Sequence, residues 1–327
     1  MKKILVIQTA SIGDVILVTP ILENLHRVFP AAEIDILVKK GQESLFLNHP
    51  FLHQTLIWNK RSFKYLRIIG LLLKIRLNRY DLVVNVQRFA SSGFLTAFSG
   101  APKRIGFSKN PFASFFTTQV EHVIGGGAHE VERNMMLLYD LIEYNEVKPR
   151  LYPSEKDIEK IKRYIRPPYY TISPTSLWHT KQLPAGKWIS FLQIIDPETR
   201  IYFLGSGGDG GICDNIISKS GINNGVNLAG KLSLLESAAL MKEAKMNFTN
   251  DSAPMHLASA VNAPVTAIFC STTPKFGFGP LSDDSHILET IEKLACRPCG
   301  LHGLAQCPEK HFACAMTINT QQFLERL

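Results

Sequence analysis

Three groups of polar residues, each following a predicted strand, have the types and spacing to do chemistry. In the first, the apolar run from Lys3 to Ile7 ends in a polar turn that contains Gly13 and Asp14. In an α/β fold such a turn lies at the carboxyl edge of the sheet, where an aspartate could act as a general base. The same carboxylate could equally cap the first turn of the following helix. Gly13 would let another molecule approach closely.

The second group follows the predicted strand at residues 169–173. Thr175 and Ser176 supply hydroxyl groups, and Lys181 supplies a positive charge. Hydroxyl donors combined with a lysine ammonium are typical of a phosphate-binding loop. Taken alone, Lys181 could also be an ordinary surface lysine.

The third group lies between a predicted strand at residues 246–249 and a predicted helix at residues 255–261. It contains Asp251, Ser252, Ala253 and His256. The N-terminus of a helix binds anions through its exposed amides and its dipole. Ser252 could instead be a simple helix N-cap, and His256 could be a buried core histidine. Together, three such groups predict a binding site more strongly than any one of them does.

Strands that alternate with helices along the chain predict an α/β fold, with parallel sheets covered on both faces. The expected strands lie at residues 3–7, 33–38, 55–58, 81–86, 169–173, 200–204, 246–249 and 265–269. The expected helices include residues 63–77, 155–164, 188–195, 234–243 and 255–261. The proline-containing segment 148–153 predicts a linker, so we expect two doubly wound, Rossmann-like domains at residues 1–150 and 151–327.

Charge is distributed unevenly along the 327 residues, whose net charge is +8. Residues 60–109 contain eleven Lys and Arg against one acid, Asp81. Such a stretch favours an anionic partner, although it could also be a solvated basic surface.

No segment reaches roughly 20 uninterrupted apolar residues, so no membrane span is predicted. The early polar residues Gln8, Ser11 and Asp14 argue against a signal peptide, and we expect a cytoplasmic protein.

The sequence resembles the heptosyltransferase family of bacterial lipopolysaccharide synthesis, glycosyltransferase family 9. The resemblance covers most of the chain and depends on the order and spacing of five short segments, at residues 12–15, 104–107, 129–134, 178–184 and 250–258. It implies a GT-B fold, in which two Rossmann-like domains face each other across a cleft. It departs from the family pattern at Ala253, where glycine is common, and at Gln182-Leu183, where Arg-Trp is more usual.

The resemblance also implies an activity, the transfer of heptose from ADP-heptose to the inner core of lipopolysaccharide with inversion at the anomeric carbon. In this interpretation residues 1–150 bind the acceptor, and residues 151–327 bind the donor. Asp14 would be the general base and Lys181 would hold the donor diphosphate. Asp251 would contact the donor sugar, and further donor-binding residues would be Thr175, Ser176, Ser252, Ala253 and His256. No Asp-x-Asp pair occurs in the chain, so we expect transfer without a metal or other cofactor.

The acceptor in this family is an anionic, lipid-anchored sugar core. Candidate acceptor-binding residues are Gly13, Lys60, Arg61, Lys64 and Arg104. The apolar face formed by Ile68, Ile69, Leu71 and Leu72 could touch lipid, which would make the protein peripheral at the inner face of the cytoplasmic membrane. At helical spacing, however, such a face more often belongs to the core.

Four cysteines near the C-terminus leave several possibilities open. Cys296, Cys299, Cys307 and Cys314 begin with the CxxC spacing of a zinc site but continue irregularly, and they could also be reduced thiols or form a disulfide. His302 and His311 are close enough in sequence to replace a cysteine ligand.

One alternative function is a related transferase with another nucleotide sugar or glycan acceptor. A second, of another class, is a basic nucleic-acid-binding protein with a zinc-binding tail; no recognised nucleic-acid motif supports it.

Overall fold

The computed structural model describes residues 1–327 except 61–63, 144, 146–147, 167 and 325–327, and gives only the backbone of residues 64, 65 and 324. The chain forms two compact units, Met1–Tyr152 and Pro153–Leu327. The division falls within the proline-containing segment expected to be a linker.

The first unit contains a six-stranded parallel sheet with the order β3-β2-β1-β4-β5-β6. Its strands are β1 (Lys3–Ile7), β2 (Glu33–Lys39), β3 (Leu52–Trp58), β4 (Leu82–Asn85), β5 (Lys103–Phe107) and β6 (Thr118–Val120). Its helices are α1 (Ile12–Ile16), α2 (Thr19–Val28), α3 (Lys64–Asn78), α4 (Ala90–Ala97) and α5 (Glu130–Met135), with short 3₁₀ turns η1 (Glu43–Phe46), η2 (Ala113–Phe115) and η3 (Met136–Leu138).

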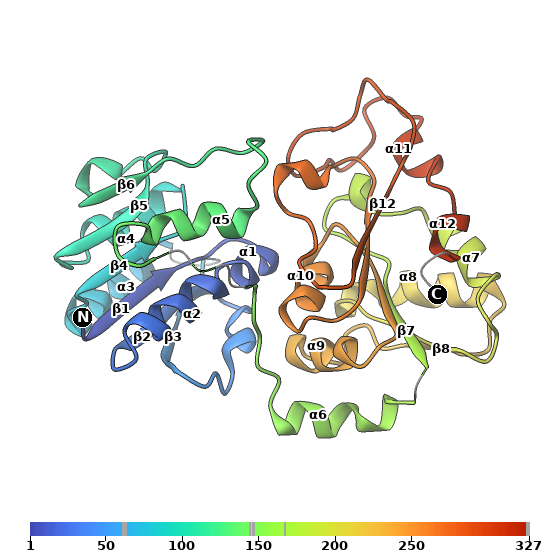
Figure 1. Ribbon diagram of the computed structural model, residues 1–327, viewed down its shortest axis with the longest axis horizontal. Helices are drawn as coiled ribbons and strands as arrows, with labels where there is room; N and C mark the ends of the chain where they lie inside the picture. The colour runs from blue at the N-terminus through green and yellow to red at the C-terminus, as the bar shows by residue number, and fades with distance from the viewer. Residues whose placement is uncertain (61–63, 144, 146–147, 167, 325–327) are drawn as a thin grey trace. The chain divides into compact units, whose positions relative to one another are not determined.

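The central strands of this sheet are apolar along their length because both faces are covered. Residues 4–7 of β1 are fully buried. Helices α3 and α4 pack together on one face, and α2 and α5 pack together on the other (Figure 1). A parallel sheet buried on both faces needs continuous runs of large aliphatic side chains, which explains the run from Ile4 to Ile7.

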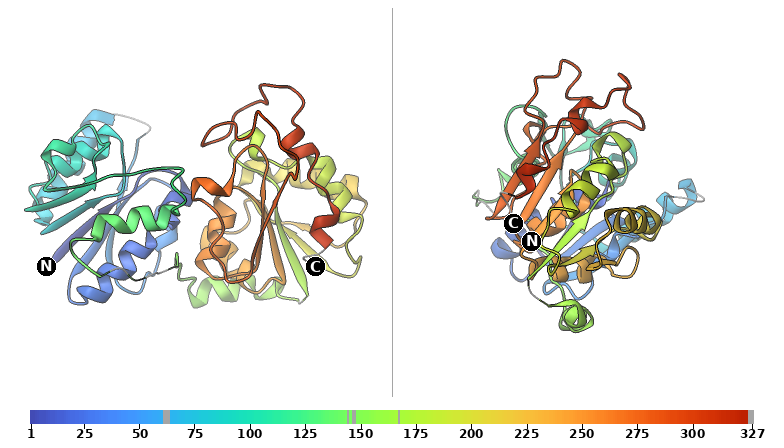
Figure 2. Two further views of the ribbon diagram at one scale, coloured as in Figure 1. Left: turned by 45° about the horizontal axis from the view of Figure 1, so that its top comes forward. Right: turned by 90° about the vertical axis from the view of Figure 1, so that its right-hand side faces the viewer.

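The second unit contains another six-stranded parallel sheet, with the order β12-β11-β10-β7-β8-β9. Its strands are β7 (Tyr169–Ser173), β8 (Arg200–Phe203), β9 (Gly225–Asn227), β10 (Met246–Asn250), β11 (Val265–Phe269) and β12 (Ser285–Glu289). Its helices are α6 (Glu155–Ile161), α7 (Ala185–Leu192), α8 (Gly210–Ser220), α9 (Leu234–Lys242), α10 (Ala253–Ala260), α11 (Ala313–Met316) and α12 (Gln321–Leu324), with 3₁₀ turns η4 (Lys162–Tyr164), η5 (His179–Lys181), η6 (Gly207–Asp209) and η7 (Pro274–Phe276). Residues 290–312 form a long irregular segment, the tail loop, between β12 and α11 (Figure 2).

Read from its other end, the second sheet has the same strand order as the first. In each, the first and fourth strands of the unit lie side by side, and the strand order reverses between them. Ligands in open α/β sheets bind beyond the carboxyl ends of the strands at this reversal. The pairs concerned are β1 with β4 and β7 with β10. The three polar groups expected to do chemistry follow β1, β7 and β10.

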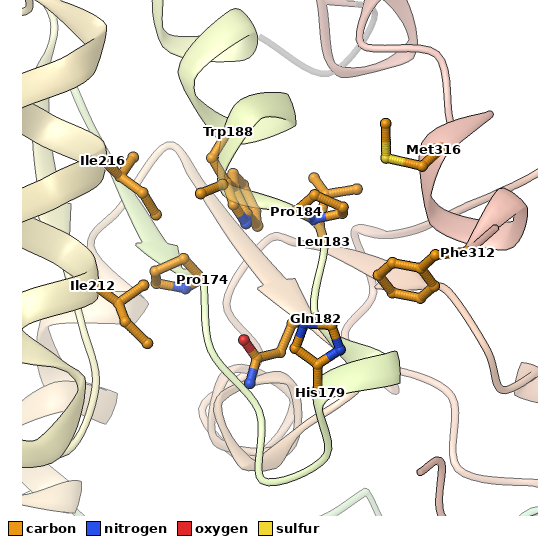
Figure 3. A pocket seen from close by; sticks show the side chains of 11 residues that line it. Pro174, His179, Gln182, Leu183, Pro184, Trp188, Ile212, Ile216, Phe312 and Met316 are labelled. Carbon is orange, nitrogen blue, oxygen red and sulfur yellow. The ribbon is translucent and has the colours of Figure 1, made fainter. Parts of the chain in front are cut away.

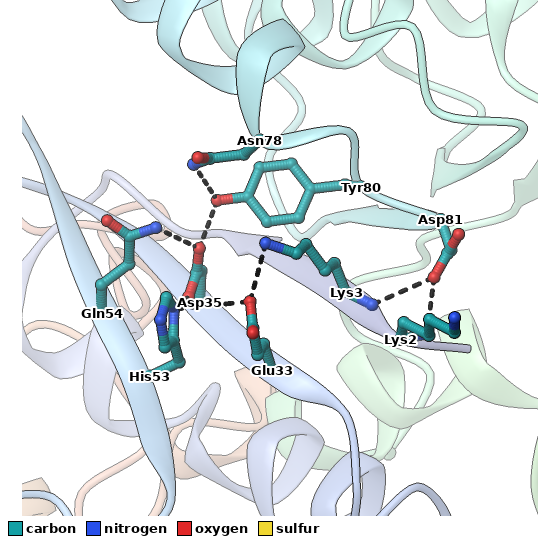
Figure 4. Close-up of polar contacts among 9 residues, drawn as sticks. All are labelled: Lys2, Lys3, Glu33, Asp35, His53, Gln54, Asn78, Tyr80 and Asp81. Atoms are coloured by element: carbon teal, nitrogen blue, oxygen red, sulfur yellow. Dashed lines mark hydrogen bonds and ion pairs between the residues drawn. The ribbon is translucent and has the colours of Figure 1, made fainter.

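A polar network near the amino end of the first sheet fastens the end of α3 (Figure 4). The buried Asp35 carboxylate accepts a hydrogen bond from the Tyr80 hydroxyl and one of 2.7 Å from Gln54 Nε2. Asn78 Nδ2, at the end of α3, donates to the Tyr80 oxygen at 2.9 Å. Burial and the hydrogen bond to Asp35 raise the pKa of the Tyr80 hydroxyl well above its usual range, so it stays protonated as a donor.

Within the described part of the chain, every helix is too short or too polar to cross a bilayer.

Candidate functional site

Asp14 lies in the first turn of α1, directly beyond the carboxyl end of β1. Its Oδ2 atom accepts hydrogen bonds from the Ser11 amide at 3.0 Å and the Ser11 hydroxyl at 2.6 Å. Ser11 Oγ in turn accepts a bond of 3.4 Å from the Asp14 amide, which completes a capping box. The capping role considered from the sequence is therefore confirmed. Because Asp14 is only half-buried, it also remains accessible to another molecule.

Residues that follow β3 and β4 hold the loop between β1 and α1. Lys60 Nζ, beyond the end of β3, donates to the backbone oxygen and the hydroxyl of Thr9, each at 3.0 Å. The Gln87 amide, beyond β4, donates to Gln8 Oε1, and both side chains are buried. Lys60 was predicted from the sequence as an acceptor-binding residue, whereas Gln8 and Gln87 were not predicted to have a role in the site. Gln87 could have been found by the rule used for Asp14, since it follows a predicted strand.

The expected acceptor-binding residues are only partly gathered around this loop. Gly13 is buried within α1, beside Asp14. Arg61 lies outside the described residues, and for Lys64 only the backbone is described. Arg104 is the second residue of β5 and donates to the backbone oxygens of Phe115 and Ala101, at the amino end of that strand. The structure therefore holds Arg104 away from the carboxyl edge and does not bring it to Asp14.

In the second unit, Lys181 and Asp251 form an ion pair at the reversal between β7 and β10. Lys181 Nζ lies 2.7 Å from Asp251 Oδ2, and the side chains are 15% and 8% exposed. The Thr272 hydroxyl, which follows β11, donates to the same oxygen at 2.6 Å. An ammonium held by a carboxylate at a strand end can bind an anion only by sharing or exchanging that partner. Thr272 was missed in the sequence, although it too comes directly after a predicted strand.

The other predicted donor-binding residues lie around this ion pair. Ser252 occupies the N-cap position of α10 without a capping hydrogen bond; its hydroxyl donates to the Asn250 and Thr175 backbone oxygens at 3.3 and 3.5 Å. Ser252 therefore has the N-cap position considered from the sequence, but its hydroxyl does not cap the helix. Ser176 is half-buried, and its backbone oxygen accepts a 2.6 Å bond from Gln182 Nε2. Ala253 begins α10, and the buried His256 lies on its first turn.

The tail loop packs directly against the loop that carries Lys181. The Thr180 amide donates to the Leu304 oxygen at 3.1 Å, and the Leu304 amide donates to Thr180 Oγ1 at 2.8 Å. Gly303, with φ of +75°, lies so close that a Cβ atom there would be 2.8 Å from Lys181 Cγ. Only glycine fits this contact without a shift of the lysine stem.

The four tail cysteines are free thiols. Burial, followed by the neighbouring Cys296 and Cys307 sulfurs, raises the pKa of Cys299. Burial also raises the pKa of Cys314, to about 11. In the described residues, no group of three or more His, Cys, Asp or Glu side chains is arranged to hold a metal ion.

A cavity of about 370 Å³ opens beside the loop that carries Lys181 (Figure 3). Gln182 and His179 supply its polar lining, and neither Lys181 nor Asp251 takes part. The remaining lining is apolar and comes from α7, α8, the segment after β7 and the residues around α11: Pro174, Leu183, Pro184, Ala185, Trp188, Ile212, Ile216, Phe312 and Met316.

A buried charge cluster supports α5, the helix that packs on α2. Arg133 Nε donates to Glu130 Oε2 at 2.8 Å, and His122 Nε2 lies 3.2 Å from the same oxygen. Burial tends to raise the pKa of Glu130, but hydrogen bonds and electrostatic interactions with His122 and Arg133 outweigh it and lower that pKa.

Comparison with known proteins matches these features to one enzyme family. The family model for glycosyltransferase family 9 (heptosyltransferase) matches residues 69–302. The chain belongs to glycosyltransferase family 9. It is therefore a glycosyltransferase, and this membership favours the enzyme hypothesis over the nucleic-acid-binding one.

Individual relatives agree with the family assignment. Lipopolysaccharide heptosyltransferase 3 of Escherichia coli is 28% identical over 275 residues, which cover 80% of this chain and 81% of that protein. The structure of E. coli ADP-heptose lps heptosyltransferase II superposes with a TM-score of 0.81 at 22% identity, covering 100% of this chain and 97% of that one. E. coli heptosyltransferase WaaC with ADP-2-deoxy-2-fluoro heptose gives a TM-score of 0.73 at 16% identity, with 99% of each chain covered. These structures share the fold of this family 9 glycosyltransferase, which confirms the expected GT-B architecture.

Proposed function

We propose that this family 9 glycosyltransferase transfers heptose from ADP-heptose to the inner core of lipopolysaccharide, with inversion at the anomeric carbon. The observation that carries the proposal is the placement of Asp14 and of the Lys181–Asp251 pair at the two strand-order reversals of a family 9 chain. The names of its relatives, which include lipopolysaccharide heptosyltransferases, support this donor and acceptor.

Asp14 acts as the general base in this proposal. Its carboxylate takes the proton of an acceptor hydroxyl as that oxygen forms a bond to the anomeric carbon. The hydrogen bonds from Ser11 fix the position of the carboxylate. Lys60 and Gln87 fix the loop from which the Asp14 helix starts, so the base is held by a rigid frame.

Lys181 acts on the leaving group. The bond between the anomeric carbon and the diphosphate oxygen breaks, and its electron pair leaves with ADP. Lys181 stabilises the negative charge that grows on the diphosphate, with the α10 N-terminus nearby. Asp251 contacts the donor sugar, while Thr175, Ser176, Ser252, Ala253 and His256 surround the phosphates. These groups can act without a metal ion, and we expect transfer to continue in EDTA.

The test compares two aspartates that cap helices in the same way. Asp14→Asn keeps a side-chain acceptor for Ser11 but removes the base, so turnover should fall about 10²- to 10⁴-fold. Binding of ADP, measured by calorimetry, should stay unchanged. Asp157→Asn is the matched control, because Asp157 forms the same capping box with Ser154 in α6. Transfer at the parental rate by Asp14→Asn would show that another residue is the base.

The identity of the donor has its own measurement, because the selection of the sugar depends on individual contacts in the binding loops. ADP-heptose should bind in EDTA more tightly than the UDP and GDP sugars do. Tighter binding of another nucleotide sugar would favour the alternative of a related transferase with a different donor.

A further inference from the structure

The outward face of α3 is apolar, although a surface helix normally turns polar residues to water. Leu66, Ile69, Leu73 and Leu77 are 74%, 47%, 56% and 81% exposed. Their spacing of three or four residues places all four on one side of the helix. The opposite side is also apolar, and its residues Ile68, Leu71 and Ile75 are buried against the sheet.

This arrangement confirms the core alternative for most of the face considered from the sequence. Ile68 and Leu71 belong to the core, and Leu72 packs against it. The residues available to a partner are instead Leu66, Ile69, Leu73 and Leu77, which we call the α3 stripe. Isolated apolar residues are common on protein surfaces, but a continuous stripe on one face marks an interaction site.

Cationic residues border the α3 stripe. On the helical wheel, Arg67 and Lys74 lie at one margin of the stripe and Arg76 lies at the other. Asp81 is the one acid between residues 60 and 109, and its carboxylate accepts the amides of Lys2 and Lys3 at 2.6 and 3.0 Å. A surface that combines apolar side chains with positive charge and lacks acids matches an anionic bilayer.

Aromatic side chains extend the surface beyond the end of α3. Arg76 donates to the Phe98 backbone oxygen at 3.1 Å, which ties α3 to the end of α4. Phe98 and Phe115, 37% and 51% exposed, lie with ring centroids 5.6 Å apart. Aromatic rings and long cationic side chains are the groups that settle at the level of lipid headgroups.

The α3 stripe starts near the loop between β1 and α1, which precedes Asp14. Lys60, four residues before α3 begins, binds Thr9 in that loop. Between two parallel strands, a crossover helix runs back from the carboxyl edge of the sheet to the amino edge. Leu66 therefore lies toward the edge that carries Asp14, and Leu77 lies toward the Asp35–Tyr80 network.

We propose that the α3 stripe and its cationic margins lie in the headgroup region of an anionic bilayer, so that a lipid-anchored acceptor reaches Asp14 from the membrane surface. The purpose of this contact rests on the proposed function. The contact itself can be measured without any sugar transfer.

The experiment measures sedimentation of the full chain with vesicles of phosphatidylcholine containing about 30% phosphatidylglycerol. The variant Leu66→Ser/Leu73→Ser/Leu77→Ser should bind at least about tenfold more weakly than the parent. The control Ile158→Ser/Ile291→Ser removes exposed isoleucines from the second unit and should bind like the parent. Lys74→Glu should weaken binding to these vesicles, and vesicles of phosphatidylcholine alone should bind the parent poorly.

Two further readouts separate the possible explanations. Circular dichroism melting checks that the triple variant is folded, and its turnover on a lipid-free soluble acceptor should match that of the parent. Equal vesicle binding by the parent and the triple variant, or no binding by the parent, would overturn the proposal. So would a parent dimer that the triple variant converts to monomers, since the occupant would then be a second copy. If the protein bound vesicles but transferred no heptose, the proposal of membrane contact would stand and the proposed function would be refuted.

Discussion

At the scale of single residues, the Lys181–Asp251 ion pair sets the condition for the proposed binding of the donor. The two side chains neutralise each other at 2.7 Å, so an incoming diphosphate must compete with a carboxylate that is already in place. Thr272 holds the same carboxylate oxygen at 2.6 Å, which keeps Asp251 from following Lys181 toward the anion.

Substitution of Lys181 should therefore mainly weaken the binding of ADP, whereas substitution of Asp251 should mainly weaken the selection of the donor sugar. Lys181→Ala should weaken ADP binding about 10- to 100-fold, as expected for the loss of a charged hydrogen-bond donor worth about 1.5–3 kcal/mol. Asp251→Asn keeps an acceptor for Thr272 and removes the competing charge. It should bind ADP at least as tightly as the parent does, but lose part of its preference for ADP-heptose over ADP.

Calorimetry with ADP and with ADP-heptose checks both expectations. Lys219→Ala is the control, since it removes an exposed lysine from α8. If Asp251→Asn weakened ADP binding as strongly as Lys181→Ala, Asp251 would be part of the phosphate site.

At the scale of elements, α5 is held by a carboxylate whose protonation should control stability in acid. The pKa of Glu130 is lowered in the folded protein from its ordinary value of 4.5. A lowered pKa means that folding stabilises the ionised form of Glu130. Its contribution to the free energy of unfolding is therefore complete above the ordinary pKa of 4.5 and is lost as the pH falls through the lowered pKa. Urea unfolding of the parent should therefore show a falling free energy of unfolding below about pH 4.5.

Glu130→Gln should remove this part of the pH dependence. At pH 7 it should cost about 3–5 kcal/mol, because Arg133 is left buried without its partner. Glu132→Gln is a neighbouring control on the exposed side of α5. Parallel pH profiles of the parent and Glu130→Gln would show that the cluster does not contribute to acid unfolding.

Helix α3 shows how far an element can be predicted from its sequence. Its position was predicted almost to the residue, since the apolar spacing is clear. The preference for burial of Ile68 and Leu71 is confirmed, but the sequence did not reveal that Leu66, Ile69, Leu73 and Leu77 form a second, exposed apolar face of the same period. Periodicity fixes the helix, but packing against the sheet decides which stripe is buried.

The residues of the candidate site likewise divide into those that the sequence indicated correctly and those that it did not. Asp14, Lys181 and Asp251 were proposed because each follows an apolar run predicted to be a strand, and the resemblance supplied their roles; the structure places each after such a strand. Arg104 was placed in the site although it belongs to β5, whose mixed sequence Lys-Arg-Ile-Gly-Phe gives no strand pattern. The role of Gly303 depends on a contact between residues more than a hundred positions apart, which no local pattern reveals.

At the scale of the whole molecule, positive charge is concentrated in the first unit. Residues 1–150 contain nineteen Lys and Arg against twelve Asp and Glu, whereas residues 151–327 are almost balanced. Attraction of this kind is screened by salt. The positive charge of the first unit should therefore strengthen the binding of a membrane-bound acceptor more than the binding of a small soluble donor.

Turnover on acceptor carried in anionic vesicles should accordingly fall as salt rises from about 0.05 to about 0.5 M, where the screening length shortens severalfold. Turnover on a lipid-free acceptor should change much less over the same range. Equal salt dependence with both acceptors would place the electrostatic contribution at the sugar rather than at the membrane.

The contact between Gly303 and Lys181 also limits how members of the family could exchange parts. A chimera joined at Pro153 would inherit the Lys181 loop and the tail loop from one parent, together with their matched shapes. A chimera joined after β12 would combine a lysine from one parent with a tail from another, and any residue but glycine at position 303 would press on the lysine stem. Recombination should therefore be tolerated less well at a joint between the Lys181 loop and the tail loop than at Pro153, wherever the second parent lacks glycine at the position of Gly303.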